Sequence, residues 1–195
     1  MLKRLIHITY PLYLHQTIQD LLSAVKQLKD YRLIKKYMTS PQDLTAYSSP
    51  VYTQQAYQSV HYLLIQEENI TAFVSGMALG TDMIAAEIVL KLKRKFRDIT
   101  LIAILPCRTQ AARWNKEAVV RYENILSKCD KVIVLQEEYS PNCMNKRNLY
   151  MVEHSDYVIA VWSGAEGGTA NTIRFATKKH LPVTVIDPTT LEIYC

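Results

Sequence analysis

Short apolar segments alternate with helix-like segments from about residue 70 onward, and this alternation constrains the fold more than any other feature. Nearly continuous runs of strand-forming residues occupy Ile70 to Ser75, Ile99 to Leu105, Lys131 to Leu135, Tyr157 to Val161 and Val183 to Ile186. Such runs are typical of strands that are buried on both faces of a sheet. Helix-like stretches lie between them, over residues 81–96, 109–129, 144–154 and 169–179. The pattern predicts an α/β fold, with a mostly parallel sheet and helices on both of its faces.

The first 68 residues have a different composition, with no glycine and eight of the 13 tyrosines. A strand is expected over Leu2 to Thr9 and a helix over residues 14–37, where apolar side chains share one face. Ser, Thr and Pro make residues 39–50 a linker, and a second helix is expected over residues 52–68. We therefore expect residues 1–50 to form a strand and helix extension with a linker, and residues 51–195 to form the α/β domain.

Composition excludes several classes of protein. Of the 195 residues 49% are hydrophobic and 21% charged, which is ordinary globular usage. The net charge of +5 permits an anionic ligand, but the chain has no long Lys/Arg run, so we expect no nucleic-acid partner. Without a secretion signal, an apolar span of membrane length or metal-ligand spacing of Cys and His, the chain is expected to be cytoplasmic, with free thiols and no metal.

Glycine is scarce, and its placement is the main functional signal. The chain has five glycines, where an average usage of about 7% gives roughly 14. They fall in two loops between an expected strand and an expected helix: Gly76 and Gly80 in the first glycine loop (Ser75 to Asp82), and Gly164, Gly167 and Gly168 in the second (Ser163 to Thr169). Loops at the carboxyl ends of parallel strands lie where ligands bind, and glycine lets backbone N–H groups approach an anion at a helix N-terminus.

Several side chains near these loops have two interpretations. Asp82 either stabilises the dipole of its helix or binds a ribose hydroxyl, and Thr169 either caps a helix or binds a phosphate. Arg147 either reaches an anion between the loops or forms a surface ion pair. Trp114 either stacks on a base or packs in the core.

Four blocks of sequence identify a family resemblance. In order they are SGMALGTDMIAAE, LPCRTQAARW, EEYSPNCMNKRNLYMVEHSDYVIAVW and GGTANT. They resemble the SLOG superfamily, and specifically its YpsA-like branch, over residues of about 73–187. The resemblance implies a Rossmann-like, doubly wound sheet and a nucleotide-type ligand at the two glycine loops, with no other cofactor. The residues expected to bind this ligand are Ser75, Gly76, Met77, Gly80, Thr81, Asp82, Trp114, Arg147, Gly167, Gly168, Thr169 and Asn171.

The resemblance also bears on catalysis. SLOG proteins include LOG-type phosphoribohydrolases, which cleave the N-glycosidic bond of nucleoside monophosphates and carry a glutamate shortly after their glycine stretch. Here Thr169 is followed by Ala170, Asn171 and Thr172, with no carboxylate. Glu87 and Glu166 are the remaining candidate acids. We therefore favour binding over hydrolysis.

Three functional hypotheses follow. The first is a sensor or sequestering module that binds a ligand such as NAD, ADP-ribose or AMP. The second is an N-glycoside hydrolase of nucleoside monophosphates. The third is a protein-interaction or single-stranded DNA-binding module with a vestigial pocket. By analogy with LOG relatives, we expect a homodimer or a higher homo-oligomer.

Overall fold

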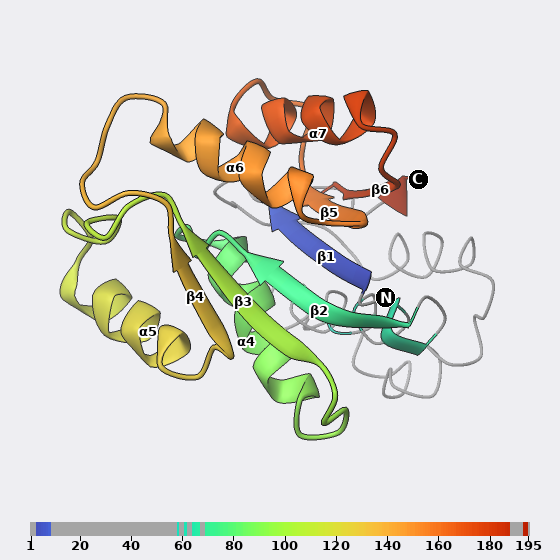
Figure 1. Cartoon of the computed structure of the whole chain (residues 1–195), viewed down its shortest axis with the longest axis horizontal. Helices are drawn as coiled ribbons and strands as arrows, with labels where there is room; N and C mark the ends of the chain where they lie inside the picture. The colour runs from blue at the N-terminus through green and yellow to red at the C-terminus, as the bar shows by residue number, and fades with distance from the viewer. Residues whose placement is uncertain are drawn as a thin grey trace, which may run out of the picture.

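The computed structural model describes residues 3–8, 58, 61, 64–66, 69–187 and 193–194, of which residues 3–8 and 193–194 are described by their backbone alone. The strands are β1 (Lys3–Ile8), β2 (Ile70–Ser75), β3 (Thr100–Leu105), β4 (Lys131–Val134), β5 (Tyr157–Val161), β6 (Val183–Ile186) and β7 (Ile193–Tyr194). They form one sheet in the order β4-β3-β2-β1-β5-β6-β7 (Figure 1). Neighbouring strands are parallel, except for the antiparallel pair β6 and β7.

The central strand of the sheet comes from the N-terminal segment. β1 pairs with β2 on one side, where Leu5 lies opposite Phe73, and with β5 on the other, where Leu5 lies opposite Tyr157. The chain adds β2, β3 and β4 outward on one side and then returns to add β5 and β6 on the other. The strand order therefore reverses between β1 and β5, and in open α/β sheets such a reversal marks the ligand crevice.

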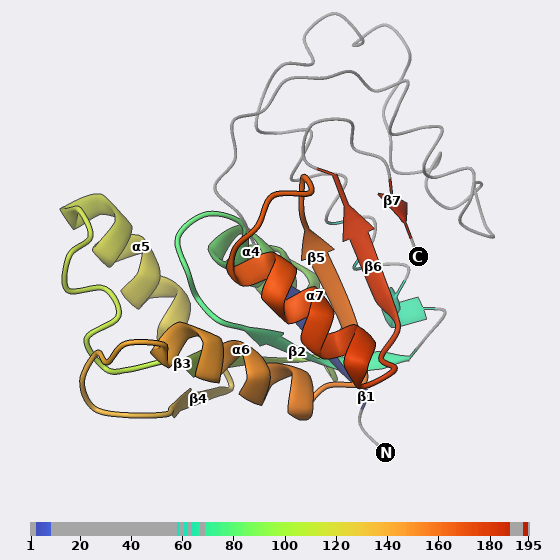
Figure 2. The ribbon, with the colours of Figure 1, turned by 90° about the horizontal axis from the view of Figure 1, so that it is seen from above.

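Helices cover both faces of the sheet, which confirms the predicted Rossmann-like α/β class. They are α4 (Thr81–Leu92), α5 (Lys116–Leu126), α6 (Cys143–Glu153) and α7 (Gly168–Lys178). α4 and α5 lie on one face and α6 and α7 on the other (Figures 1 and 2). Two apolar cores result, because alternate strand residues face opposite sides. Phe73 and Leu101 pack in the core beneath α4 and α5, whereas Val74 and Ile104 pack in the core beneath α6 and α7.

The start of α5 differs from the expectation. A helix was expected from residue 109, but α5 begins at Lys116 because the side chain of Asn115 accepts a hydrogen bond from the backbone N–H of Ala118 at 2.8 Å. Such an N-cap satisfies an N–H group that the first helical turn leaves without a partner. Turns occupy the residues between β3 and this cap. They place Gln110 near the first glycine loop, as described below.

Several expectations fall on residues that the structure does not describe. The helix expected over residues 14–37 and the linker over residues 39–50 lie outside the described residues, so the domain boundary at residue 50 stays a prediction. Of the helix expected over residues 52–68, residues 58, 61 and 64–66 are described, and they are helical. Within the described ranges, none of the helices combines the length and apolarity needed to cross a bilayer.

Candidate functional site

The first glycine loop folds back on the start of α4. The hydroxyl of Ser75, at the end of β2, accepts a hydrogen bond from the backbone N–H of Met77 at 3.1 Å and donates one to the carbonyl of Asp82 at 3.1 Å. The Asp82 carboxylate accepts a hydrogen bond from the backbone N–H of Ala78, also at 3.1 Å. Met77 has a φ of 55°, which turns the chain away from the strand. These contacts fix the loop without any ligand.

Gly76 is required by a close approach of Arg147. The guanidinium Nη1 of Arg147, on α6, donates a hydrogen bond to the carbonyl of Gly76. A Cβ atom at residue 76 would overlap that guanidinium and lie 2.9 Å from Oδ2 of Asp82. Gly76 is expected to allow close approach of an anion, whereas in the structure the group that approaches it is the Arg147 cation.

Gln110 closes the same loop from the other side. Its Nε2 atom donates to the carbonyls of Gly76 at 3.3 Å and Met77 at 2.8 Å. Gln110 is 7% exposed and Thr81 is 2% exposed. Within the described part of the chain, Oε1 of Gln110 and Oγ1 of Thr81 are buried without a hydrogen-bond partner. Buried polar atoms are nearly always paired, so these two oxygens, one at the start of α4 and one in the turns after β3, are exceptions beside the first loop.

A chain of hydrogen bonds joins the two glycine loops. Nε of Arg147 donates to the side-chain oxygen of Asn148 at 2.7 Å, and Nδ2 of Asn148 lies 3.5 Å from the carbonyl of Gly168, to which it donates. The hydroxyl of Thr172 donates to the same carbonyl at 2.8 Å. Because Arg147 also holds Gly76, one pair of residues on α6 contacts both loops. The structure therefore brings the two loops to a common element, as their positions after parallel strands predict.

The second glycine loop is held less firmly. Gly164 has a φ of 89° and Gly167 a φ of 151°, a region that side-chain-bearing residues rarely adopt. The indole N–H of Trp162 donates to the carbonyl of Ala165 at 2.7 Å. Glu166 is exposed and forms an ion pair with Arg174 on α7. Gly168 is exposed at the first position of α7, and a Cβ atom there would meet only Nδ2 of Asn148, at 3.7 Å.

Helix N-termini meet both loops. α4 begins after Gly80 and α7 after Gly167, and in neither helix does an N-cap side chain accept a hydrogen bond from the first turn. The free N–H groups of a first turn, together with the helix dipole, favour an anion. Of the candidate residues in that turn of α7, Thr169 is buried, and half-buried Asn171 accepts a hydrogen bond from Arg174 at 2.9 Å.

Arg147 is the buried charge of this region. It is 5% exposed, and burial lowers the pKa of its guanidinium, while the nearby Asp82 carboxylate opposes that shift. Burial also raises the pKa of Tyr122, on α5, to about 12. A buried guanidinium beside a single carboxylate is costly unless its remaining hydrogen-bonding capacity is used. Its third nitrogen, Nη2, donates to none of the residues that the structure describes.

The other candidate residues lie apart from this arrangement. Trp114 packs edge-on against Tyr122, with ring centroids 5.2 Å apart, on the α4 and α5 face of the sheet. Glu87 forms a two-pronged ion pair with Arg121 at 2.8 Å, which ties α4 to α5. The pKa of Glu166 is lowered by its hydrogen bond with an arginine. Each candidate acid is thus paired with an arginine, and these arginines lie on different helices, α5 and α7. The structure does not bring the two acids together.

Sequence reasoning missed three residues that build the site: Gln110, Asn148 and Thr172. Gln110 belongs to the LPCRTQAARW block and Asn148 follows Arg147 directly, so both were within the quoted blocks. Their partners are carbonyl oxygens of residues 20–34 positions away, and such contacts leave no local pattern. For Asn148 its place beside Arg147 was an available signal, and for Thr172 the hydrogen bond back to Gly168 is local to α7.

The fold and the glycine loops define a Rossmann-like domain whose strand order reverses beside the second loop. The sequence profile of the YspA SLOG family matches residues 52–191, and the chain belongs to this family. It is 35% identical over 130 residues to the uncharacterized SPbeta prophage-derived protein YoqJ of Bacillus subtilis, covering 60% of this chain and 76% of YoqJ. It is 28% identical over 131 residues to a UPF0398 protein of Halalkalibacterium halodurans, covering 66% of this chain and 69% of that protein.

Two solved structures share the fold. DNA processing protein A of Helicobacter pylori, described as binding single-stranded DNA, matches with a TM-score of 0.55 at 19% identity, over 95% of this chain and 65% of that one. DNA processing protein A of Streptococcus pneumoniae matches with a TM-score of 0.55 at 14% identity, over 95% of this chain and 50% of that one. The present chain therefore spans about two thirds and one half of these proteins.

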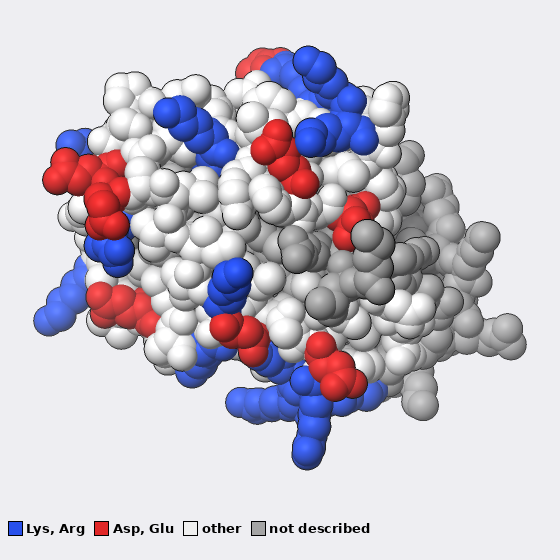
Figure 3. Space-filling view, viewed as in Figure 1, with Lys and Arg blue, Asp and Glu red and all other residues white. Residues whose placement is uncertain are grey.

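This likeness contradicts the expectation against a nucleic-acid partner. That expectation rested on the lack of a long Lys/Arg run, yet a protein with this fold binds single-stranded DNA. The physical reason is that a positively charged groove for a single strand is assembled in three dimensions from residues far apart in sequence. On the face seen in Figure 3, Lys and Arg lie in scattered groups around the rim rather than in one stripe.

Proposed function

We propose that this chain binds a nucleotide or nucleotide-derived ligand, such as NAD, ADP-ribose or AMP, at the two glycine loops, as a sensor or sequestering module. The observation that carries the proposal is the contact of one residue pair, Arg147 and Asn148, with both loops. A phosphate at the start of α7 would meet free backbone N–H groups and lie beside Asn148, which joins it to the buried Arg147 cation.

The ligand's hydrogen-bonding groups have matching partners in the first loop. Thr81 offers a hydroxyl, and Gln110 offers an acceptor oxygen. A ribose hydroxyl or an exocyclic amine supplies the donor that Gln110 lacks, which offsets the cost of leaving these atoms unpaired. We assign phosphate recognition to the second loop and nucleoside recognition to the first.

The experiment that tests this compares AMP, ADP-ribose and NAD with adenosine, which has no phosphate, by thermal unfolding. At about 100 times its dissociation constant, a true ligand raises the free energy of unfolding by about 2.7 kcal/mol. Gly168→Val is expected to abolish the shift with a small change in the unligated protein, because space for a Cβ atom exists there. Thr177→Val, at an exposed position further along α7, is the matched control and should leave the shift intact. Equal shifts with AMP and adenosine, or none with any nucleotide, would contradict the proposal.

Hydrolysis is tested on the same protein. Glu87 is occupied by an ion pair with Arg121, and the hydrogen bond from Arg174 lowers the pKa of Glu166, whereas a general acid must carry a proton. We therefore expect no release of base from AMP. Release that is lost in Glu87→Gln or Glu166→Gln would replace the binding proposal with an N-glycoside hydrolase.

Single-stranded DNA is a second candidate ligand, which the likeness to the Helicobacter pylori protein favours. The same cation and helix N-termini would then hold the phosphates of a strand. Binding to a strand falls steeply as salt rises, because each phosphate contact releases counterions. An affinity for an oligonucleotide that drops at least tenfold between 50 and 200 mM salt, and that Gly168→Val weakens, would support this candidate over a mononucleotide.

A further inference from the structure

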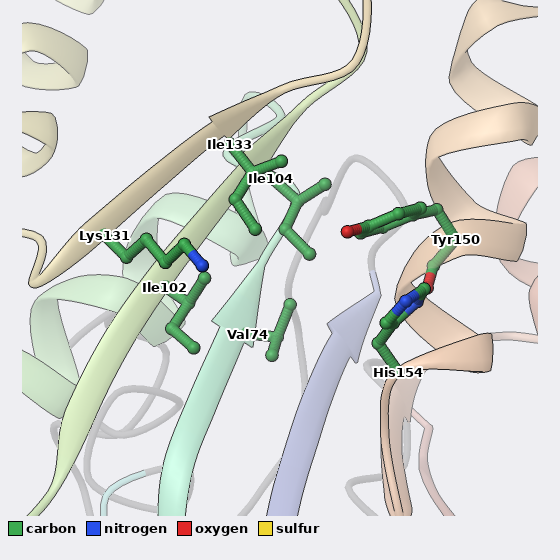
Figure 4. A pocket seen from close by; sticks show the side chains of 7 residues that line it. All are labelled: Val74, Ile102, Ile104, Lys131, Ile133, Tyr150 and His154. Atoms are coloured by element: carbon green, nitrogen blue, oxygen red, sulfur yellow. The ribbon is translucent and has the colours of Figure 1, made fainter.

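A hollow of about 180 Å³ lies on the α6 and α7 face of the sheet, away from the glycine loops (Figure 4). Its apolar residues come from three adjacent strands: Val74 on β2, Ile102 and Ile104 on β3, and Ile133 on β4. Tyr150 and His154, on and just after α6, stand on one side, and Lys131 at the start of β4 extends toward them from the other (Figure 4). The hollow exists because α6 covers only part of the sheet, so β3 and β4 continue beyond it.

The polar groups of the hollow are arranged asymmetrically. The rings of Tyr150 and His154 stack with centroids 4.0 Å apart and an interplanar angle of 22°, and Nδ1 of His154 is hydrogen-bonded to the backbone carbonyl of Tyr150 at 2.8 Å. The stacking and the hydrogen bond hold in place the two rings that form one wall of the hollow. Among the described residues, Lys131, which is exposed, forms no ion pair, and no carboxylate lines the hollow. The lining therefore combines an apolar floor, an aromatic wall and an exposed lysine ammonium group.

Size and charge together select the class of ligand. A cavity of about 150 Å³ holds benzene, so this hollow has room for one ring or a branched aliphatic group and is too small for a nucleotide. The ammonium calls for a negative group at one end of that ligand. We propose that the hollow binds a small carboxylate with a single ring or a branched aliphatic chain, whose apolar part lies on the isoleucine floor and whose carboxylate pairs with Lys131.

This site is separate from the proposed nucleotide site. Lys131 is the first residue of β4, and His154 follows the last residue of α6. The charged end of the hollow therefore lies toward the amino-terminal end of β4, whereas the glycine loops follow the carboxyl ends of their strands. The inference therefore does not depend on nucleotide binding, and the two sites should be occupied independently.

The experiment measures binding of benzoate and 4-methylpentanoate by ligand-observed NMR and calorimetry, with benzyl alcohol as the neutral analogue. We expect a dissociation constant on the order of 1 mM for each acid, as is typical of so small a ligand, and at least about tenfold weaker binding of the alcohol. Lys131→Met should reduce the affinity for both acids to that of the alcohol. Lys128→Met, which removes the same charge from an exposed residue outside the hollow, should leave the affinity unchanged.

Several outcomes overturn the inference. Absence of binding by both acids does so, as does equal affinity of benzoate and benzyl alcohol or an affinity that Lys131→Met leaves intact. A second copy of the chain is the alternative occupant. If Ile133→Glu converts a dimer into a monomer in sedimentation and neither acid binds the wild type, the hollow is an interface rather than a ligand site. A failure of AMP to bind, with benzoate binding retained, would count against the nucleotide proposal alone.

Discussion

The two glycine loops follow parallel strands of one sheet, yet they are built differently. The first is buried, held by Ser75, Asp82 and Gln110, and pressed against the Arg147 guanidinium. The second is largely exposed, and its one charged side chain, Glu166, pairs with an arginine at the surface. Gly76 serves close packing in the first loop, whereas Gly80 in that loop, and Gly164 and Gly167 in the second, have positive φ angles. Similar glycine-containing loops thus arise from two distinct physical requirements.

Because the two glycine loops are built differently, substitutions in them should affect different properties of the protein, stability in one case and ligand affinity in the other. The first loop is already ordered by its own contacts, so it forms a rigid wall against which a ligand needs no further ordering. The second loop keeps its backbone accessible at the start of α7. Substitutions in and beneath the first loop should therefore act chiefly on the free energy of unfolding, whereas those in the second should act chiefly on ligand affinity.

The largest effect is expected at the buried charge. Arg147→Met removes the cation and leaves the carboxylate of Asp82, which is 3% exposed, without it. Loss of the guanidinium's hydrogen bonds to Asn148 and Gly76, and of its attraction for that carboxylate, is expected to cost about 3 kcal/mol. Urea unfolding followed by circular dichroism measures this loss. Arg174→Met, which breaks the surface pair beside the second loop, should leave the midpoint unchanged. If the two variants unfold at the same urea concentration, the contrast between the loops is wrong.

The next largest effect on stability is expected when Gly76, rather than Gly168, is replaced by alanine. Gly76→Ala introduces a Cβ atom that overlaps the guanidinium and approaches Asp82, so either the arginine or the loop has to move. Overpacking of this kind costs about 3 kcal/mol. Gly168→Ala meets open space apart from one contact at 3.7 Å, and it should be neutral or stabilising by about 0.5 kcal/mol. Urea unfolding of the two variants under the same conditions tests this prediction. A Gly76→Ala protein as stable as the wild type would refute the prediction.

Sequence alone accounted for β1 to β6 and for the glycine loops, but not for the short antiparallel strand β7 or for how each loop is held. β2, β5 and β6 have the expected limits, because apolar runs of strand-forming residues bounded by polar ones mark a buried parallel strand locally. The start of α5 was not predicted, since it depends on a cap that forms only in the folded chain, and the choice between the two interpretations of Trp114 required its contact with Tyr122. Likewise, the role of Gly76 depends on Arg147, which lies 71 residues further along the chain.

The burial of Tyr122 should affect the free energy of unfolding only in alkaline solution. The hydroxyl of Tyr122, near Arg147, has a pKa raised from 10.0 to about 12, chiefly by burial. As the pH rises, the unfolded chain releases this proton first, so the free energy of unfolding falls between about pH 10 and pH 12. Tyr122→Phe should flatten that fall.

The control for this prediction is Cys129. Burial raises the pKa of its thiol from 9.0 to about 11, so it contributes a separate fall that begins at lower pH and that Tyr122→Phe leaves in place. Urea midpoints measured from pH 8 to 12 distinguish the two contributions. A profile that Tyr122→Phe does not alter would show that the tyrosine hydroxyl is solvated rather than buried in the core beneath α4 and α5.

The smallest effect on stability is expected at Thr81, and it is the most informative about the ligand. Its hydroxyl is buried and has no partner among the residues that the structure describes, so Thr81→Val removes an unpaired polar atom while keeping the shape of the side chain. Such a change is nearly neutral or slightly stabilising. Thr172→Val is the matched control, because it deletes a hydroxyl that donates to Gly168 at 2.8 Å and should cost about 1 kcal/mol. If the Thr81 hydroxyl serves a nucleotide, Thr81→Val will weaken AMP binding severalfold at unchanged stability, which calorimetry measures. Unchanged AMP affinity together with lost stability would instead make Thr81 a structural residue, and the first loop would then contribute nothing to recognition beyond its rigid backbone.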